Sequence, residues 1–266
     1  MNFGVGNRDL LILPGLSTVG IAGKGESLAG RYSALGKDHR VTVLDMPQPI
    51  PEDFTFETAA RTAALAMESL GIARADVLGI SMGGMIAQYL ALCRPEMVRS
   101  MVLVSTVSGP DRILKENLDR WIRTAPNARR RELEKTMFAL MHTQSHTERF
   151  SGLLFPENSP SGDYEKEFDR KRFVALCRLC LSCSVYERLS GIAVPALVIG
   201  GAGDRVMDPE SFRLTAEGLG CELFIYPELG HALYDEAADF LQRVLSFFEG
   251  IDERSINGEH HQDKRP

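Results

Sequence analysis

The sequence predicts an α/β protein in which a mostly parallel sheet is flanked by helices. Short aliphatic or β-branched runs, bounded by Gly, Pro or Asp, alternate with stretches of helical periodicity along most of the chain. The apolar runs lack polar alternation, which is typical of strands covered on both faces. The length of 266 residues suits one such domain with room for a small insertion. We therefore expect one main core.

Six runs are expected to form the sheet, and the segments between them supply its helices. The strands, in chain order, are Leu10–Leu13, Val41–Asp45, Asp76–Ile80, Met101–Val104, Ala196–Gly200 and Glu222–Tyr226. The helices are Glu57–Leu70, Met82–Cys93, Glu210–Glu217 and Asp235–Phe248. The first helix is followed by Gly71, a residue type that favours a helix end.

One segment interrupts this alternation, because from about Asp111 to Ser190 the chain shows helical patterns and no strand run. We interpret it as a helical cap, residues 111–190, inserted into a core of residues 1–110 and 191–251. Residues 111–191 carry 15 Lys and Arg against 12 Asp and Glu, so the insertion is the expected contact for an anionic substrate. The polar residues 252–266 are expected to form a flexible tail.

Composition and charge exclude several classes of protein. Hydrophobic residues make up 44% and charged residues 25%, close to the globular average, which argues against a disordered, collagen-like or coiled-coil chain. The net charge is −6 and no basic run is longer than three residues, as in Arg129-Arg130-Arg131, so no nucleic-acid partner is expected. No apolar run approaches the roughly 18 residues of a membrane helix, so no membrane partner is expected.

Cysteine usage favours a cytoplasmic protein with reduced thiols. The five cysteines are odd in number and unevenly spread: Cys93, Cys177, Cys180, Cys183 and Cys221. A chain of this length can bury a core without disulfides. The first nine residues also lack the basic and apolar regions of a signal peptide. The cluster from Cys177 to Cys183 lacks a fourth ligand nearby, so we interpret it as small buried hydrophobic residues.

Three histidines are expected to have structural roles. His142 and His146 are four residues apart, but no Glu follows as in a helical zinc motif, so we expect them to pack at the surface or cap a helix. His39 precedes a predicted strand and is expected at the surface. No metal site is predicted.

The strongest local motif is Gly79-Ile80-Ser81-Met82-Gly83-Gly84, where a predicted strand ends and a predicted helix begins. A turn sharp enough to present a serine hydroxyl above a sheet strains the backbone and demands small residues two positions before and after. Gly79 and Gly83 meet that demand. Ser81 is therefore the candidate nucleophile.

A serine hydroxyl needs a base to take its proton, and the base needs a third group to orient it. Asp204 and His231 each follow a predicted strand, so both should lie with Ser81 at the carboxyl edge of the sheet. Asp208 is an alternative acid, but it stands beside Pro209, where capping a helix is the simpler role.

With these motifs in the order serine, acid, histidine, the chain resembles the α/β-hydrolase superfamily, specifically its small capped esterases, lactonases and perhydrolases, over nearly all of residues 8–250. The resemblance implies an oxyanion hole formed by the backbone N–H groups of Leu16 and Met82. Members usually carry His-Gly before the first of these donors, whereas this chain has Pro14-Gly15.

We expect a serine hydrolase that acts on a small-molecule ester or lactone without a metal or organic cofactor. A perhydrolase or a carbon–carbon bond hydrolase could use the same triad, and a ligand receptor with little turnover could retain it, because one fold hosts all of these functions. A homodimer is a further open alternative. Apolar cap residues are expected to line an acyl pocket: Trp121, Met137, Phe138 and Leu154.

Overall fold

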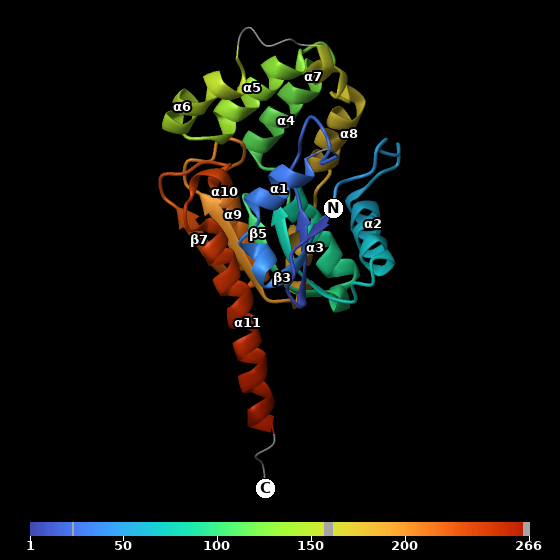
Figure 1. Cartoon of the computed structure of the whole chain (residues 1–266), viewed down its shortest axis with the longest axis vertical. Helices are drawn as coiled ribbons and strands as arrows, with labels where there is room; N and C mark the ends of the chain where they lie inside the picture. The colour runs from blue at the N-terminus through green and yellow to red at the C-terminus, as the bar shows by residue number, and fades with distance from the viewer. Residues whose placement is uncertain (23, 157–161, 263–266) are drawn as a thin grey trace.

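The computed structural model describes residues 1–22, 24–156 and 162–262, and it contains one seven-stranded sheet (Figure 1). The strand order is β1-β3-β2-β4-β5-β6-β7, and every neighbouring pair is parallel except β1 with β3. This arrangement confirms the predicted fold class. The strands are β1 (Asn2–Phe3), β2 (Arg8–Leu13), β3 (His39–Val43), β4 (Ala75–Ile80), β5 (Val98–Val104), β6 (Ala196–Gly201) and β7 (Glu222–Tyr226). The edge strand β1 was not predicted.

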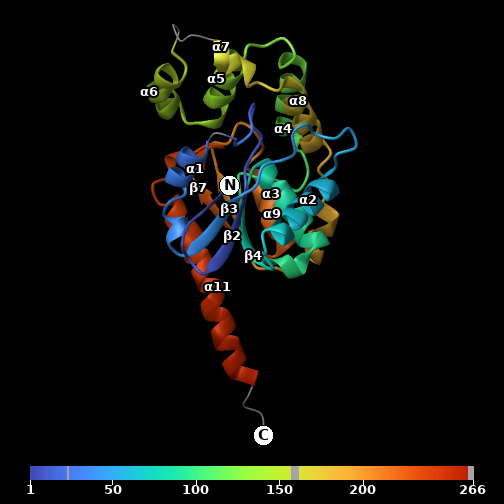
Figure 2. The same cartoon turned by 45° about the vertical axis from the view of Figure 1, so that its right-hand side comes forward.

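Helices cover both faces of the sheet, as Figures 1 and 2 show. One face packs against α2 (Phe56–Ser69), α3 (Met82–Cys93) and α9 (Glu210–Leu219). The other packs against α1 (Gly25–Arg31), the 3-10 turn Leu35–Lys37 and the first half of α11 (Phe240–Gln262). Successive residues of β2 enter opposite layers, since Leu11 belongs to the first core and Ile12 to the second. The continuous apolar runs of the sequence reflect this double coverage.

Between β5 and β6 the described residues form helices and no strand. The helices are α4 (Arg112–Thr124), α5 (Arg130–Met141), α6 (Gln144–Leu154), α7 (Gly162–Lys166), α8 (Arg170–Leu181) and the 3-10 turn Tyr186–Gly191. Helices α4 to α8 lie together at one end of the sheet, above the strands in Figures 1 and 2. We refer to residues 111–190 as the cap.

The C-terminal region differs from the prediction in two ways. The expected helix Asp235–Phe248 is divided into α10 (Leu233–Glu236) and α11, with an extended residue, Ala237, after α10. Helix α11 also continues beyond the expected end at Phe248, as far as Gln262, and the expectation of a flexible tail over residues 252–266 stays a prediction. Residues 263–266 lie outside the described residues.

The expectation that His39 lies at the surface is wrong. Its side chain is fully buried at the start of β3, where its ring meets Phe248 of α11 edge-on at 5.8 Å. Its Nε2 lies 3.7 Å from Asp76 Oδ2. The burial comes from α11, a helix some 200 residues away in sequence, so no local pattern around His39 reports it.

In the part of the chain that is described, no helix is both long and apolar enough to cross a membrane.

Candidate active site

Ser81 occupies the tight turn between β4 and α3. Its backbone angles are φ 53° and ψ −119°, a conformation that non-glycine residues rarely adopt. Two hydrogen bonds hold the turn: the Ser81 N–H donates to Val104 O at 2.8 Å, and the Thr106 hydroxyl donates to Ser81 O at 2.7 Å. The strained backbone is therefore secured by the neighbouring strand β5 and the residues that follow it.

The glycines around this turn are required by close approach of the backbone. A Cβ on Gly79 would lie 2.7 Å from Gly84 Cα, and one on Gly83 would lie 1.9 Å from Leu13 O. Helix α3 thus packs directly against β4 and β2, as the small-residue pattern of the sequence predicts.

The structure brings Ser81, His231 and Asp204 together. His231 Nε2 lies 3.1 Å from Ser81 Oγ, and its Nδ1 lies 2.8 Å from Asp204 Oδ2. Because an ionised carboxylate can only accept, the Nδ1–H donates to Asp204, and the lone pair of Nε2 faces the serine hydroxyl. The other oxygen of Asp204 accepts the N–H groups of Val206 at 2.7 Å and Met207 at 3.1 Å. Both oxygens of Asp204 are therefore engaged, which orients its carboxylate.

The alternative acid, Asp208, is directed elsewhere. Its side chain accepts the Glu210 N–H at 3.1 Å at the start of α9, and its own N–H donates to Asp111 at 3.0 Å. It therefore has the helix-capping environment expected from its position before Pro209.

The two expected oxyanion donors, Leu16 and Met82, border the same cavity as Ser81 and His231. Met82 begins α3, where backbone N–H groups lack partners within the helix. In the part of the chain that is described, the N–H groups of Leu16 and Met82 donate no backbone hydrogen bond in a turn, a loop or a helix cap. The loop that carries Leu16 passes close to the nucleophile, since a Cβ on Gly15 would lie 3.1 Å from Ser81 Cβ. Replacement of the usual His by Pro14 leaves this approach in place.

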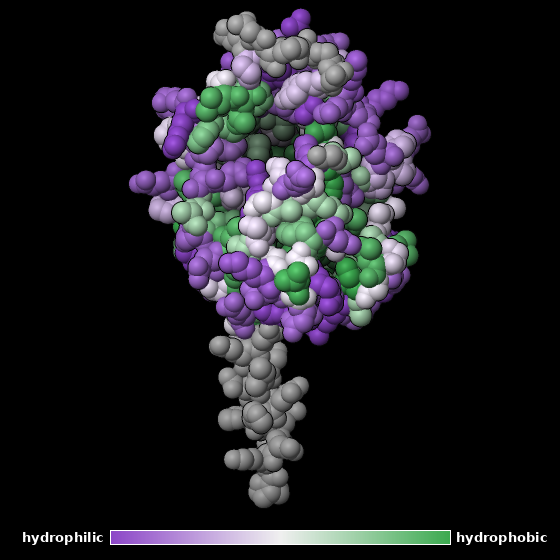
Figure 3. All heavy atoms as spheres, in the orientation of Figure 1, coloured by the Kyte–Doolittle hydropathy of each residue, from purple (hydrophilic) through white to green (hydrophobic). Residues whose placement is uncertain are grey.

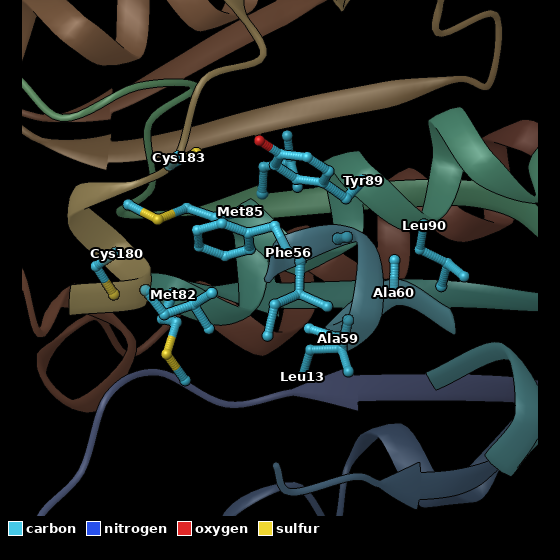
Figure 4. Packing of buried hydrophobic residues seen from close by; sticks show 14 of the residues in the cluster. Leu13, Phe56, Ala59, Ala60, Met82, Met85, Tyr89, Leu90, Cys180 and Cys183 are labelled. Carbon is cyan, nitrogen blue, oxygen red and sulfur yellow. The ribbon is translucent and has the colours of Figure 1, made fainter. Parts of the chain in front are cut away.

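The cavity above Ser81 lies between the core and the cap. Its cap lining consists of Leu114, Leu118, Trp121, Met137, Met141 and Cys180, and its core lining includes Met82, Met85, Val206, Met207 and Tyr234. It leaves about 30 Å³ of free space. Met82, Met85 and Cys180 belong to the buried hydrophobic cluster of Figure 4, so the cavity is continuous with the core.

Two of the four predicted cap residues, Trp121 and Met137, line the cavity, whereas Phe138 and Leu154 do not. Phe138 stacks on His142, with ring centroids 4.0 Å apart, and Leu154 is 55% exposed. Neighbouring residues on a helix point about 100° apart, so Met137 and Phe138 cannot both face the cavity. Figure 3 shows hydrophobic surface over the α5 and α6 part of the cap, beside a hollow between the cap and the core.

The cysteines from Cys177 to Cys183 and the pair His142 and His146 pack against other side chains of the cap or core. Cys177, Cys180 and Cys183 are buried free thiols. His142, expected to pack at the surface or cap a helix, is 6% exposed and is the C-cap residue of α5, and its ring stacks on that of His146 at 4.7 Å. In residues 1–22, 24–156 and 162–262, no three His, Cys, Asp or Glu side chains are grouped as a metal site would require.

Contacts between the cap and the loop after Asp204 were not predicted from the sequence. Asn117 of α4 is buried, and its amide donates to Arg205 O at 2.9 Å and Val206 O at 3.1 Å, directly after Asp204. The Arg205 guanidinium donates to His142 O at 2.9 Å, at the C-terminal end of α5. The only available signal was a polar residue within the apolar stripe of α4, which does not identify a partner 88 residues away.

Asp45 was also missed as a support for the Leu16 loop. Its side chain accepts the Ile21 N–H at 2.9 Å and forms an ion pair with Arg172 of α8 at 2.7 Å. Asp45 stands at the carboxyl end of β3, the edge at which sites form in open α/β sheets. That position was the signal that could have singled it out.

Comparison with known proteins places this geometry in a family. Residues 11–238 match the family described as the alpha/beta hydrolase fold. A Mycobacterium tuberculosis protein (strain ATCC 25618 / H37Rv), provisionally named non-heme bromoperoxidase BpoC, is 31% identical over 217 residues, covering 75% of this chain and 78% of that protein. The enol-lactonase structure from Burkholderia xenovorans LB400 is similar with a TM-score of 0.78 and 22% identity, covering 94% of this chain and 95% of that one.

A second relative aligns over a shorter segment. A Pseudomonas savastanoi pv. phaseolicola protein, provisionally named carbamate hydrolase RutD, is 33% identical over 98 residues, which cover 35% of this chain and 38% of that protein. The family match over most of the chain does not depend on this partial alignment. The chain therefore belongs to the α/β-hydrolase fold family and is an enzyme of that type.

Proposed function

We propose that this protein is a serine hydrolase that cleaves a carboxylic ester or a lactone through an acyl-enzyme on Ser81. The observation that carries the proposal is the hydrogen-bonded series from Asp204 through His231 to Ser81 at the base of an apolar cavity. The names of the relatives refer to carbamate, enol-lactone and bromoperoxidase reactions, so the substrate has to be argued from this chain's own cavity.

In the acylation step, His231 Nε2 takes the proton of Ser81 as Oγ attacks the substrate carbonyl carbon. The N–H groups of Leu16 and Met82 donate to the oxyanion that forms, and each such donor contributes about 2.7–4 kcal/mol in comparable sites. Asp204 stabilises the imidazolium of His231 without taking its proton. The imidazolium then protonates the departing alkoxide, which leaves an ester bond between Ser81 and the acyl group.

In the deacylation step, His231 removes a proton from a water molecule that attacks the acyl carbon. The carboxylic acid departs and Ser81 recovers its proton. Trp121 and Met137 of the cap contact the acyl group in this proposal, because they line the same cavity as Ser81.

We also propose a cytoplasmic location, because the five cysteines are all free thiols in the structure.

A fluorophosphonate probe tests the nucleophile. The probe should label the wild type at Ser81, and Ser81→Ala should abolish labelling and lower kcat for p-nitrophenyl esters by roughly 10⁶-fold, as in a comparable triad. Ser69→Ala, on the exposed side of α2, is the matched control and should change neither. Unchanged labelling of Ser81→Ala would contradict the proposal. Labelling of Ser81 without turnover of p-nitrophenyl esters or simple lactones would favour the ligand receptor.

A further inference from the structure

The described lining of the cavity contains no Lys, Arg, Asp, Glu, Asn or Gln. Its polar side-chain groups are those of Ser81 and His231, the Cys180 thiol and the Tyr234 phenol. Burial raises the pKa of the Cys180 thiol and of the Tyr234 phenol well above their usual values, so both are neutral at physiological pH. Apart from the catalytic pair, the wall offers no charge to a substrate.

Arg130 and Arg172 of the cap and Arg205, which follows Asp204, have partners of their own, and none of the three lines the cavity. Arg130 pairs with Glu134 at 2.9 Å, and Arg172 pairs with Asp45 at 2.7 Å. Arg205 donates to carbonyl oxygens at the end of α5. None of the described basic residues of the cap lines the cavity, so the lining does not favour the expected contact with an anionic substrate, which stays a prediction. The Asp204 carboxylate, which accepts from His231 at 2.8 Å, would repel an anion at the reacting end of the cavity.

We propose, building on the serine-hydrolase function above, that this site accepts neutral apolar acyl groups and excludes substrates whose acyl chain carries a carboxylate. A carboxylate that entered the cavity would lose its hydration and meet neither a cation nor an amide side chain. The transfer of a neutral aliphatic chain from water into the apolar cavity is favourable.

Methionine side chains give this neutral pocket its capacity. Five of its lining residues are methionines: Met82, Met85, Met137, Met141 and Met207. The cavity is small, at about 30 Å³, so an acyl chain enters when these unbranched side chains change rotamer. Such a wall adapts to the length of an aliphatic chain but cannot supply a compensating charge.

Three matched substrates test the proposal: p-nitrophenyl hexanoate, mono-p-nitrophenyl adipate and its methyl ester. They share the reacting ester and chain length, and they differ in whether the chain ends in a methyl group, a carboxylate or a neutral ester. We expect kcat/KM for the methyl ester to exceed that for the carboxylate by about 100-fold, or about 2.7 kcal/mol at 1.36 kcal/mol per factor of ten. A ratio below 10 overturns the inference. Failure to hydrolyse any of the three faster than Ser81→Ala overturns the proposed function itself.

A charge introduced into the cavity provides the converse test. Met137→Lys places a cation on the cavity side of α5, whereas Thr136→Lys adds the same charge to its exposed side. Met137→Lys should raise kcat/KM for the adipate monoester relative to its methyl ester by about tenfold, and Thr136→Lys should leave that ratio unchanged. Equal shifts in both variants would show a long-range field and overturn the inference. If Met137→Lys does not fold, the wild-type ratio decides.

Discussion

Single residues at this site are held by contacts that leave little freedom. Asp204 receives two backbone N–H groups on one oxygen and the His231 imidazole on the other. The Ser105 hydroxyl donates to His231 O at 2.8 Å, so the backbone of His231 is bonded to the residue that follows β5. Ser105 itself has φ 45°, so the site contains a second strained backbone besides that of Ser81.

The two candidate acids can be separated by matched substitutions. Asp204→Asn should lower kcat for a p-nitrophenyl ester by roughly 10⁴-fold, because an amide no longer holds the reactive imidazole tautomer. Asp208→Asn should change kcat less than threefold or so, since Asp208 caps α9. Steady-state kinetics with circular dichroism as the folding control checks both variants. A larger loss in Asp208→Asn would reassign the acid.

At the scale of elements, helix α4 both lines the cavity and contacts the loop that follows Asp204. One face of α4 carries Leu114, Leu118 and Trp121 into the cavity, and Asn117 on the same face binds the carbonyl groups of Arg205 and Val206. The spacing of three and four residues places all four side chains on one stripe. A substrate that displaces α4 would therefore also displace the backbone next to Asp204.

Asn117→Leu tests this coupling, because leucine branches at the same carbon and has no donor. The carbonyl groups of Arg205 and Val206, the second of them buried, lose their partner, so the free energy of unfolding should fall by about 1–3 kcal/mol. The kcat should fall while KM for p-nitrophenyl butyrate changes little, since Asp204 is misplaced. Thr124→Val is the control, because the Thr124 hydroxyl bonds within the exposed side of α4. Equal kcat losses in the two variants would show that Asn117 only stabilises the helix.

Helix α8 provides a second prediction at this scale. Burial raises the pKa of the Cys177 and Cys183 thiols, and that of Cys221 to about 11, so the reactive thiolate forms are scarce at pH 8. Iodoacetamide at pH 8 should modify the partly exposed Cys93 first. It should modify the buried Cys177, Cys180 and Cys183 only after denaturation in urea. Intact mass and peptide mapping would count the adducts. Native modification of Cys177 or Cys183 would indicate an opening of the cap.

At the scale of the whole molecule, ion pairs and hydrogen bonds fasten the cap to the core. Arg172 of α8 is 2% exposed and pairs with Asp45, which is 25% exposed, after β3. At the opposite side of the cap, the Thr143 N–H donates to Glu236 of α10 at 3.0 Å. These contacts join segments separated by 127 and 93 residues, so they form only when the complete fold assembles.

A double-mutant cycle on Asp45 and Arg172 measures the first of these contacts. Asp45→Ala should lower the free energy of unfolding by about 3 kcal/mol, the low end of the range for buried pairs, because it leaves a buried guanidinium without its partner. Arg172→Met in the same chain should recover part of that loss, since the uncompensated charge is removed. Urea unfolding of the four proteins gives the interaction energy. Additive losses would show that the pair contributes nothing.

Sequence patterns alone determined the parts of the protein that depend on short-range geometry. The glycines around Ser81 identify the turn because that backbone tolerates no Cβ, and the ends of β6 and β7 locate Asp204 and His231 because parallel strands end at one edge. The tertiary structure decided which side chains meet across elements. The rotation of α5 turns Met137 into the cavity and Phe138 away from it, and α11 buries His39. Hydrophobic periodicity identifies an apolar face but not the partner it packs against, and that choice depends on the simultaneous packing of segments far apart in the chain.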